Sequence, residues 1–257
     1  MKNTIAKGVL VSVLMLCTFF SYATETKIMV RAKAKDAKFI GSSMGGAYVM
    51  VRNAMNGTLL AEGKTRGGSG DTDLLMNTPR KRGLAISDSK TSGFLASVDI
   101  EEPTFVQIEV RAPYTHKQAQ VSASTQLWLI PGKHILGDGV ILEISGFAVD
   151  ITSPRTHEFI HTQSLDDNGL EIRANVVMMC GCTIIEDGIW DASQMEVVAL
   201  ILKNDEKVAE LPMQYMAPNL FGMTAKNLTA GHYEMIVYAY NGDTGNTGVD
   251  TVNFILN

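Results

Sequence analysis

The sequence predicts an all-β protein made of two tandem β-sandwich domains that follow a cleaved signal peptide. Three observations lead to this fold class. Apolar residues alternate with polar ones in many short stretches, no stretch repeats its apolar residues at the helical interval, and clusters of Gly, Asn, Asp and Pro separate the stretches. Ile28, Val30 and Ala32 show this alternation, as do Val49 and Val51. With 257 residues, of which 46% are hydrophobic, the chain is long enough to bury the cores of two domains.

The N-terminal segment Met1–Ala23 has the features of a secretory signal peptide. Lys2 and Lys7 precede an apolar run, and Ser21-Tyr22-Ala23 has the small residues typical of a cleavage site. The run is short for a membrane span, and no later segment approaches the roughly 18 apolar residues that a spanning helix needs. We therefore expect an exported protein, periplasmic or extracellular, with no membrane span in the mature chain.

The charge of the chain limits the classes of partner. Its formal net charge is -5, whereas domains that bind nucleic acid usually carry a basic excess. We therefore expect no nucleic-acid partner, and a protein or glycan of the cell envelope is the partner that an exported module would meet.

The first predicted domain spans residues 24–146. Its Gly46–Thr65 stretch reads as a strand, an Asn56-Gly57 turn of type I′ and a second strand. This stretch resembles the carboxypeptidase-regulatory and transthyretin-like modules, and the resemblance implies a small sandwich of about seven strands. The long Arg66–Gly93 segment, rich in Gly, Ser, Thr and basic residues, departs from that pattern and is predicted to be a binding loop or a mobile loop.

The second predicted domain spans residues 147–257. Val149–Pro154 resembles the opening strand of bacterial immunoglobulin-like domains, and Gly231–Gly248 resembles their penultimate strand and final loop. Tyr233, at the entry to that strand, fits the tyrosine corner of such sandwiches. The intervening strands are expected at Gly169–Met179, Met195–Lys203, Lys207–Met216 and Leu220–Leu228.

Cys180 and Cys182 form the most reactive cluster of the mature sequence. They follow a predicted strand whose alternation places Met178 in the core, and they begin the loop that contains Trp190. In the immunoglobulin-like topology this loop lies near the domain junction. One interpretation is a small disulfide, because oxidation is the default in an exported protein.

A soft-metal site is the alternative interpretation of the two cysteines. Thiolates and thioethers suit Cu(I), and less specifically Zn(II). The predicted ligands are Cys180, Cys182, Met179 and Met195, and His134, His157 and His161 are possible neighbours. A thiol-redox role is a third alternative. Calcium binding through Asp71, Asp73 or Asp243 is also considered, although acidic turn residues are commonly just solvated.

The function expected from these features is non-enzymatic binding or assembly, because no catalytic constellation is complete. Gly41–Gly45 fits the pattern of a hydrolase nucleophile but lacks its strand, turn and helix context. We expect the loops at the domain junction to meet the partner. Their predicted contact residues are Gly181, Trp190, Asn241, Asp243 and Asn246. Trp128 is predicted to lie in the core of the first domain.

Overall fold

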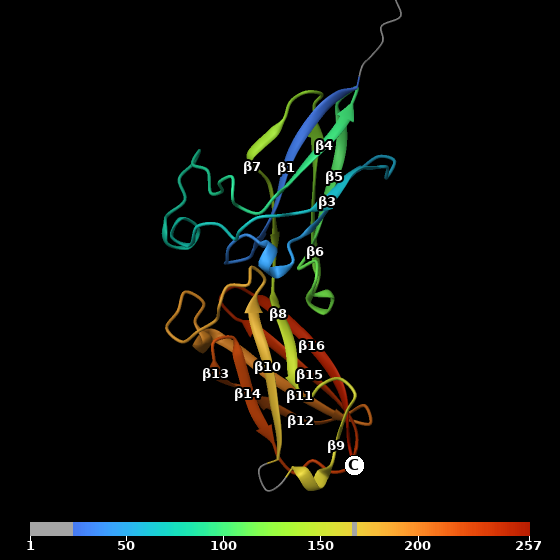
Figure 1. Ribbon diagram of the computed structural model, residues 1–257, viewed down its shortest axis with the longest axis vertical. Coiled ribbons are helices and arrows are strands. Elements are labelled where there is room, and N and C mark those ends of the chain that lie inside the picture. Colours follow the sequence, from blue (N-terminus) through green and yellow to red (C-terminus); the bar gives the residue numbers. More distant parts are fainter. Residues whose placement is uncertain (1–22, 166–168) are drawn as a thin grey trace, which may run out of the picture.

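Figure 1 shows the computed structural model, which describes residues 23–165 and 169–257 of the chain. The strands form two β bodies stacked along the long axis, one built from β1–β7 and the other from β8–β16. Within the part of the chain that the structure describes, no hydrogen-bonded sheet contains strands from both groups. The all-β class and the tandem sandwich architecture are therefore confirmed. Apart from Ala23, the predicted signal peptide Met1–Ala23 lies outside the described residues.

The N-terminal body is a sandwich of two sheets with strand orders β4-β1-β7 and β3-β2-β5-β6. β1 and β7 are parallel, and the other neighbours are antiparallel. Its seven strands are β1 (Thr24–Ala34), β2 (Tyr48–Asn53), β3 (Leu59–Lys64), β4 (Phe94–Ile100), β5 (Thr104–Ala112), β6 (Val121–Leu129) and β7 (Ile135–Ile144). Ile28 and Val30 of one sheet and Ile108 and Val110 of the other are fully buried in the core between them.

The predicted hairpin exists, but its turn differs from the prediction. Gly57 has a positive φ of 76°, whereas Asn56 does not, so the turn is not of type I′. Asn53 closes a longer loop instead: its side-chain oxygen accepts hydrogen bonds from the backbone N–H groups of Met55 and Asn56. The sequence signal was misread because an Asn three residues earlier caps the turn and leaves only glycine with the unusual backbone angle.

The C-terminal body consists of two sheets with orders β13-β14-β10-β8 and β12-β11-β15-β16-β9. Its strands are β8 (Phe147–Ser153), β9 (Glu158–Ile160), β10 (Leu170–Met178), β11 (Met195–Lys203), β12 (Glu206–Pro212), β13 (Gln214–Ala217), β14 (Leu220–Ala225), β15 (Gly231–Asn241) and β16 (Asn246–Leu256). The entry segment divides between the sheets, since β8 pairs with β10 and β9 pairs in parallel with β16. This arrangement is an immunoglobulin-like sandwich.

Two details of this sandwich bear on the predictions. The single strand expected at Lys207–Met216 is divided into β12 and β13, which belong to different sheets, with buried Met213 between them. The tyrosine corner is present: the Tyr233 hydroxyl donates to the carbonyl of Thr229 at 2.7 Å and accepts from the Thr229 N–H at 3.2 Å.

The long segment between β3 and β4 is fastened at its base and exposed at its tip. Arg66 and Gly93 exchange two backbone hydrogen bonds, and buried Arg31 donates to the carbonyls of Thr91 and Ser92. Beyond this base the segment makes the short helix η2 (Asp73–Asn77), and its tip projects to one side of the molecule (Figure 1). Residues 77–85 are all exposed.

Asp138 of β7 holds the returning side of the same segment near its base. Its carboxylate accepts hydrogen bonds from the N–H groups of Ile86 and Ser87 and from the Ser87 hydroxyl. Burial opposes ionisation of this carboxyl, but the hydrogen bonds from Ser87 and Ile86 outweigh it and lower the pKa of Asp138. The loop is therefore an anchored projection from the first sandwich.

Four short helical turns complete the secondary structure of the described residues: η1 (Ser42–Met44), η3 (Lys117–Ala119), η4 (Thr162–Ser164) and η5 (Ala192–Gln194). Within the described residues, no helix is long and apolar enough to cross a membrane.

Candidate functional site

The candidate site lies where the two sandwiches meet, at the C-terminal end of β10. Alternate residues of this strand, from Leu170 to Met178, face the core and are buried. After Met178 the chain turns sharply, and the Gly181 N–H donates to the Met178 carbonyl at 2.7 Å. The turn brings the Cα atoms of Cys180 and Cys182 to 5.3 Å, and their sulfurs form a disulfide.

The disulfide turn packs against the first sandwich. Gly181 has a φ of +78°, and a Cβ atom placed there would lie 2.7 Å from Cγ of Met44 in η1. Both the backbone angle and the close approach require glycine at this position. Gly181, predicted to contact a partner, lies against Met44 of its own chain and is still exposed.

Trp190 links the same loop to the segment after β1. Its indole N–H donates to the backbone carbonyl of Asp36 at 2.9 Å, and only 8% of the residue is exposed. Trp190, predicted as a contact residue, is therefore buried at the junction, where its polar and apolar surfaces are both used.

Asn246 is a second side chain that joins the halves. Its amide nitrogen donates to the Lys35 carbonyl at 3.2 Å, while its oxygen accepts from the Gly146 N–H at 2.8 Å. Asn241 is also buried, and its oxygen accepts hydrogen bonds from Thr244 within the β15–β16 turn. These two predicted contact residues thus hold backbone groups inside the protein. Of the five, Gly181 and Asp243 are exposed.

Two cavities lined by both sandwiches flank the side chains of Ile189 and Trp190. One, of about 420 Å³, is bounded by the disulfide turn and by Lys38 and Ser69 of the first sandwich. The other, of about 260 Å³, is lined by polar groups that include Asp36 and Asp243. Burial raises the pKa of the Asp36 carboxyl, against the opposing effect of the nearby Lys33 charge.

The predicted metal ligands border three different cavities. The cysteines border the 420 Å³ cavity, Met195 borders the 260 Å³ cavity, and Met179 borders a third cavity of about 550 Å³. The Sδ atom of Met195 accepts from the Asn241 amide at 3.6 Å. In the disulfide neither sulfur is a thiolate, which is the form that binds Cu(I) or Zn(II).

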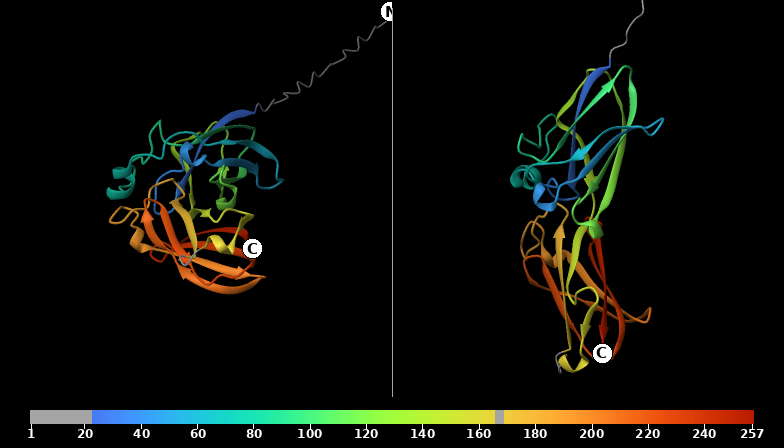
Figure 2. Two further views of the ribbon diagram at one scale, coloured as in Figure 1. Left: turned by 60° about the horizontal axis from the view of Figure 1, so that its bottom comes forward. Right: turned by 45° about the vertical axis from the view of Figure 1, so that its right-hand side comes forward.

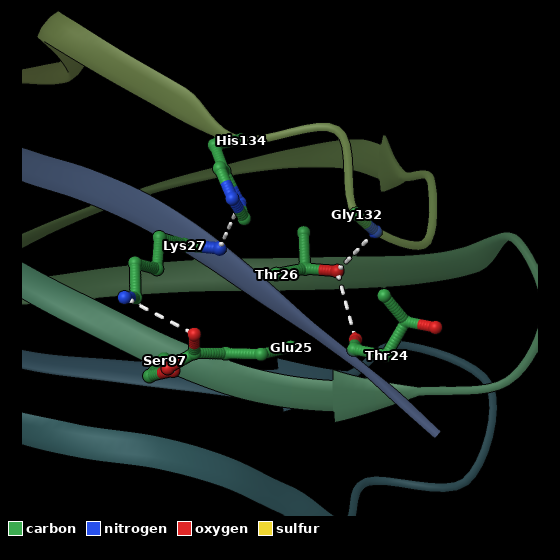
Figure 3. Close-up of polar contacts among 7 residues, drawn as sticks. All are labelled: Thr24, Glu25, Thr26, Lys27, Ser97, Gly132 and His134. Atoms are coloured by element: carbon green, nitrogen blue, oxygen red, sulfur yellow. Dashed lines mark hydrogen bonds and ion pairs between the residues drawn. The ribbon is translucent and has the colours of Figure 1, made fainter. Parts of the chain in front are cut away.

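The histidines considered as neighbours lie away from the disulfide. Figure 3 shows His134 at the start of β1, where its Nδ1 accepts from the Lys27 N–H at 3.1 Å. The same end of β1 is held by the Thr26 hydroxyl, which accepts from the Gly132 N–H. His157 lies beside the C-terminal part of β16, where its N–H donates to the Asn253 carbonyl, and His161 is the N-cap residue of η4. Across residues 23–165 and 169–257, no group of three or more His, Cys, Asp or Glu residues could hold a metal ion.

The acidic residues considered for calcium have other roles. Asp71 accepts from the Leu74 N–H at 2.7 Å, and Asp73 accepts from the Asn77 side chain at 2.8 Å, so both stabilise the turn around η2. The sequence reasoning missed Asp36 and Met44 as junction residues. Asp36 acts through its backbone carbonyl, and Met44 acts through the close packing of its side chain. Neither role produces a recognisable sequence motif.

Comparison with known proteins found similarity to solved structures only. No protein-family model matches the chain, and no curated protein matches it. A structure titled as the fibronectin(III)-like modules of Clostridium thermocellum CbhA is 14% identical, with a TM-score of 0.26 and coverage of 81% of this chain and 77% of that one. Titin domains z1z2 in complex with telethonin are 11% identical, with a TM-score of 0.25 and coverage of 91% and 95%.

Proposed function

We propose that the protein is an exported, non-enzymatic binding or assembly module of the cell envelope. The partner is an envelope protein or a glycan, bound on the face that carries the 420 Å³ cavity at the junction. This cavity is the observation that carries the proposal, because residues of both sandwiches line it and Ser69 of the long segment is among them. A site built from two domains is formed only when the domains are held together, as the Trp190 and Asn246 contacts hold them.

We call this surface the junction face and define it by Lys38, Ser69, Ile185, Ile189 and the exposed loop residues 77–85. Ile189 is 51% exposed and Ile185 is 38% exposed, although both belong to a well-packed loop. The tip of the long loop adds Arg80, Lys81 and Arg82. Figures 1 and 2 show the long loop and the loop after β10 on the same side of the molecule. Apolar side chains with polar and basic neighbours suit a protein or an acidic glycan partner.

Export is supported by the position of the first strand. β1 begins at Thr24, directly after the predicted cleavage site at Ala23. We further propose that the first sandwich belongs to the carboxypeptidase-regulatory or transthyretin-like modules, a proposal supported by its seven strands in two sheets. N-terminal sequencing of protein recovered from the periplasm or the medium tests export, and a start at Thr24 is the expected result. Recovery from the cytoplasm with Met1 retained contradicts it.

The junction face is tested by capture from cell-envelope extracts and on a glycan array. The variants are Ile189→Asp and a triple variant in which Arg80, Lys81 and Arg82 become Ser. The matched control is Val208→Asp, at a 52% exposed apolar position of β12. We expect the junction variants to lose a partner that the control retains. A partner retained at full strength by both junction variants contradicts the assignment of this face.

No observation on the described residues favours the copper, zinc or thiol-redox alternative over this proposal. Binding of copper or zinc requires the disulfide to be reduced first, so that Cys180 and Cys182 become thiolates.

A further inference from the structure

The β6 strand (Val121–Leu129) is an unprotected sheet edge. β5 pairs with it along all nine residues, and no strand of the described residues pairs with its other side. A free edge exposes unpaired N–H and C=O groups, and proteins usually block it with charge, proline, a bulge or short length. β6 contains no charged residue, no proline and no glycine, and its register with β5 has no bulge.

The other edge strands of the described residues are protected. β3, β4, β7, β8, β9 and β12 each contain at least one charged residue, and β12 also ends in Pro212. β13 has no charge but is only four residues long, with a register shift against its neighbour. The absence of protection on β6 is therefore specific to this strand.

The inward-facing side of β6 is incompletely covered. Residues opposite each other in an antiparallel pair share a face of the sheet. Thr125 and Val121 lie opposite Ile108 and Ala112 of β5, which are fully buried, yet Thr125 is exposed and Val121 is 40% exposed. The facing sheet has three strands against four, and it covers β6 unevenly: Leu129 is fully buried, whereas Thr125 and Val121 are not. An added strand beside β6 would bring its own side chains against these residues.

An apolar groove continues from the Val121 end of the strand. It has a volume of about 550 Å³ and lies between the two sandwiches, where Phe147, Met179, Tyr240 and Val249 form part of its lining. None of its lining residues is charged, in a chain with 19% charged residues. Val249 is 50% exposed and Tyr240 is 39% exposed, so the groove walls are accessible. This volume is within the range of ligand pockets and is sufficient for a large apolar side chain.

We propose that the free edge of β6 binds an extended, uncharged peptide segment of a partner protein, with a large apolar side chain of that segment in the adjoining groove. Backbone hydrogen bonds to β6 supply the pairing, and the groove supplies specificity. Neither β6 nor the lining of the groove has a charged residue. The partner segment is therefore neutral, because a charged side chain would lose its water there without gaining a counter-charge. Depletion of charge is also typical of the centre of an interface.

The β6 edge is separate from the junction face. η3, which precedes β6, and β16 lie on the opposite side of the molecule from the long loop (Figures 1 and 2). The two proposals therefore use different residues, and the failure of one leaves the other intact.

The test uses a labelled peptide probe of about ten residues in which Thr and Val alternate and one end carries Phe. A second probe has the same sequence with alternate backbone nitrogens methylated, which removes donors but keeps every side chain. Binding to the full mature protein is measured by fluorescence anisotropy, and amide hydrogen exchange reports which strand becomes protected. We expect the first probe to bind, to protect amides of β6, and to bind at least about tenfold more tightly than the methylated probe.

Two variants and one control locate the binding. Thr125→Lys places a charge on the β6 edge, and Val249→Glu places one in the groove. Val208→Lys is the matched control on the β12 edge. We expect each of the first two to weaken binding about tenfold or more and the control to leave it unchanged.

Several results would overturn the proposal. They are no binding of the first probe, equal binding of the methylated probe, or protection elsewhere than β6. Protection of β6 that rises with protein concentration in the absence of peptide would assign the edge to a second copy of this chain and would also overturn it. Circular dichroism of each variant confirms that it is folded before its binding is interpreted.

Discussion

The indole N–H of Trp190 donates to the carbonyl of Asp36, 154 positions earlier in the chain, across the boundary between the two sandwiches. The Asn246 amide makes a similar crossing to Lys35. Both contacts reach the short segment after β1, which lies at the junction end of the first sandwich. Side chains of the second sandwich thus bind main-chain carbonyls of the first, and the Gln118 amide of the first sandwich donates to the Asp150 carboxylate of the second.

Trp190→Phe tests the contribution of the indole donor. The change keeps most of the apolar packing and leaves the Asp36 carbonyl without this partner, so we expect a loss of about 1 kcal/mol in the free energy of unfolding. Trp190→Ala also removes the packing and should cost about 3–5 kcal/mol. Urea denaturation measures both, and small-angle X-ray scattering should show a broader distribution of shapes for the alanine variant. Trp128→Phe, at a 59% exposed position, is the control.

Asn246→Ala removes two hydrogen bonds at once. The Gly146 N–H and the Lys35 carbonyl would lose their partner at a site where Asn246 is 1% exposed. We expect a loss of about 2–3 kcal/mol in unfolding free energy, because buried groups left without partners carry the full desolvation cost. Asn253→Ala, an exposed position on the same strand, should change stability by less than about 0.5 kcal/mol. Equal stability of the two variants would contradict the role given to Asn246.

Replacement of both cysteines by serine tests the disulfide and the metal alternative together. A loop closed over so few residues restricts the unfolded chain little, so we expect a stability loss of only about 1–2 kcal/mol. The mature wild-type protein should show no free thiol when it is denatured without reductant. Elemental analysis should find the same copper and zinc content in both proteins. One metal ion per chain in the wild type that the serine variant lacks would restore the metal-site hypothesis.

Asp138→Asn should loosen the base of the long loop in a pH-dependent way. The folded state lowers the pKa of Asp138, so this carboxylate contributes stability above the ordinary aspartate pKa of about 4, and the contribution is lost as the pH falls through the lower folded value. At pH 7 we expect the variant to be less stable by about 1–2 kcal/mol, and the difference should shrink in acid. Asp99→Asn, an exposed site on β4, is the matched control. A difference that stays constant down to acid pH would contradict this origin.

The loop tip provides an independent measurement of the same anchor. Trypsin should cut the wild-type chain within Arg80-Lys81-Arg82, and the two fragments should remain together under native conditions because the base is bonded on both sides. In Asp138→Asn, cleavage should extend toward Lys90, which a mass spectrum of the fragments detects.

Sequence patterns were sufficient to predict the strands and the tyrosine corner. Alternation in β1, β2, β5 and β10 has a direct physical cause, the burial of one face of a sheet, and Tyr233 lies at a fixed position relative to its strand. The division of Lys207–Met216 into two strands of different sheets could not be predicted, because a continuous stretch of residues gives no sign of a change of sheet.

The candidate site was harder to predict because its residues act in tertiary contacts. Trp190 and Asn246 are residue types common in binding loops, but here they form hydrogen bonds with another part of their own chain. Trp128 was assigned to the core from its strand, but it lies on the outer face of an edge strand, where its ring packs on Phe105 at a centroid distance of 5.1 Å. Which face and which edge a residue occupies depends on the order of strands, and that order is not local information.

The start of β1 and the end of β16 lie at opposite ends of the long axis, and the chain crosses between the sandwiches once, in the short link between β7 and β8 (Figure 1). A pulling force between those ends runs along the strands, so the ladder of eleven paired positions between β15 and β16 is loaded in shear and resists as a unit. In the described residues the junction is held by side-chain contacts such as those of Trp190, Asn246 and Gln118, without a strand ladder across it. Under tension the sandwiches should therefore separate from each other before either unfolds. The protein would extend as two folded domains joined by the β7–β8 link, and the domains would recover their alignment when the force is released.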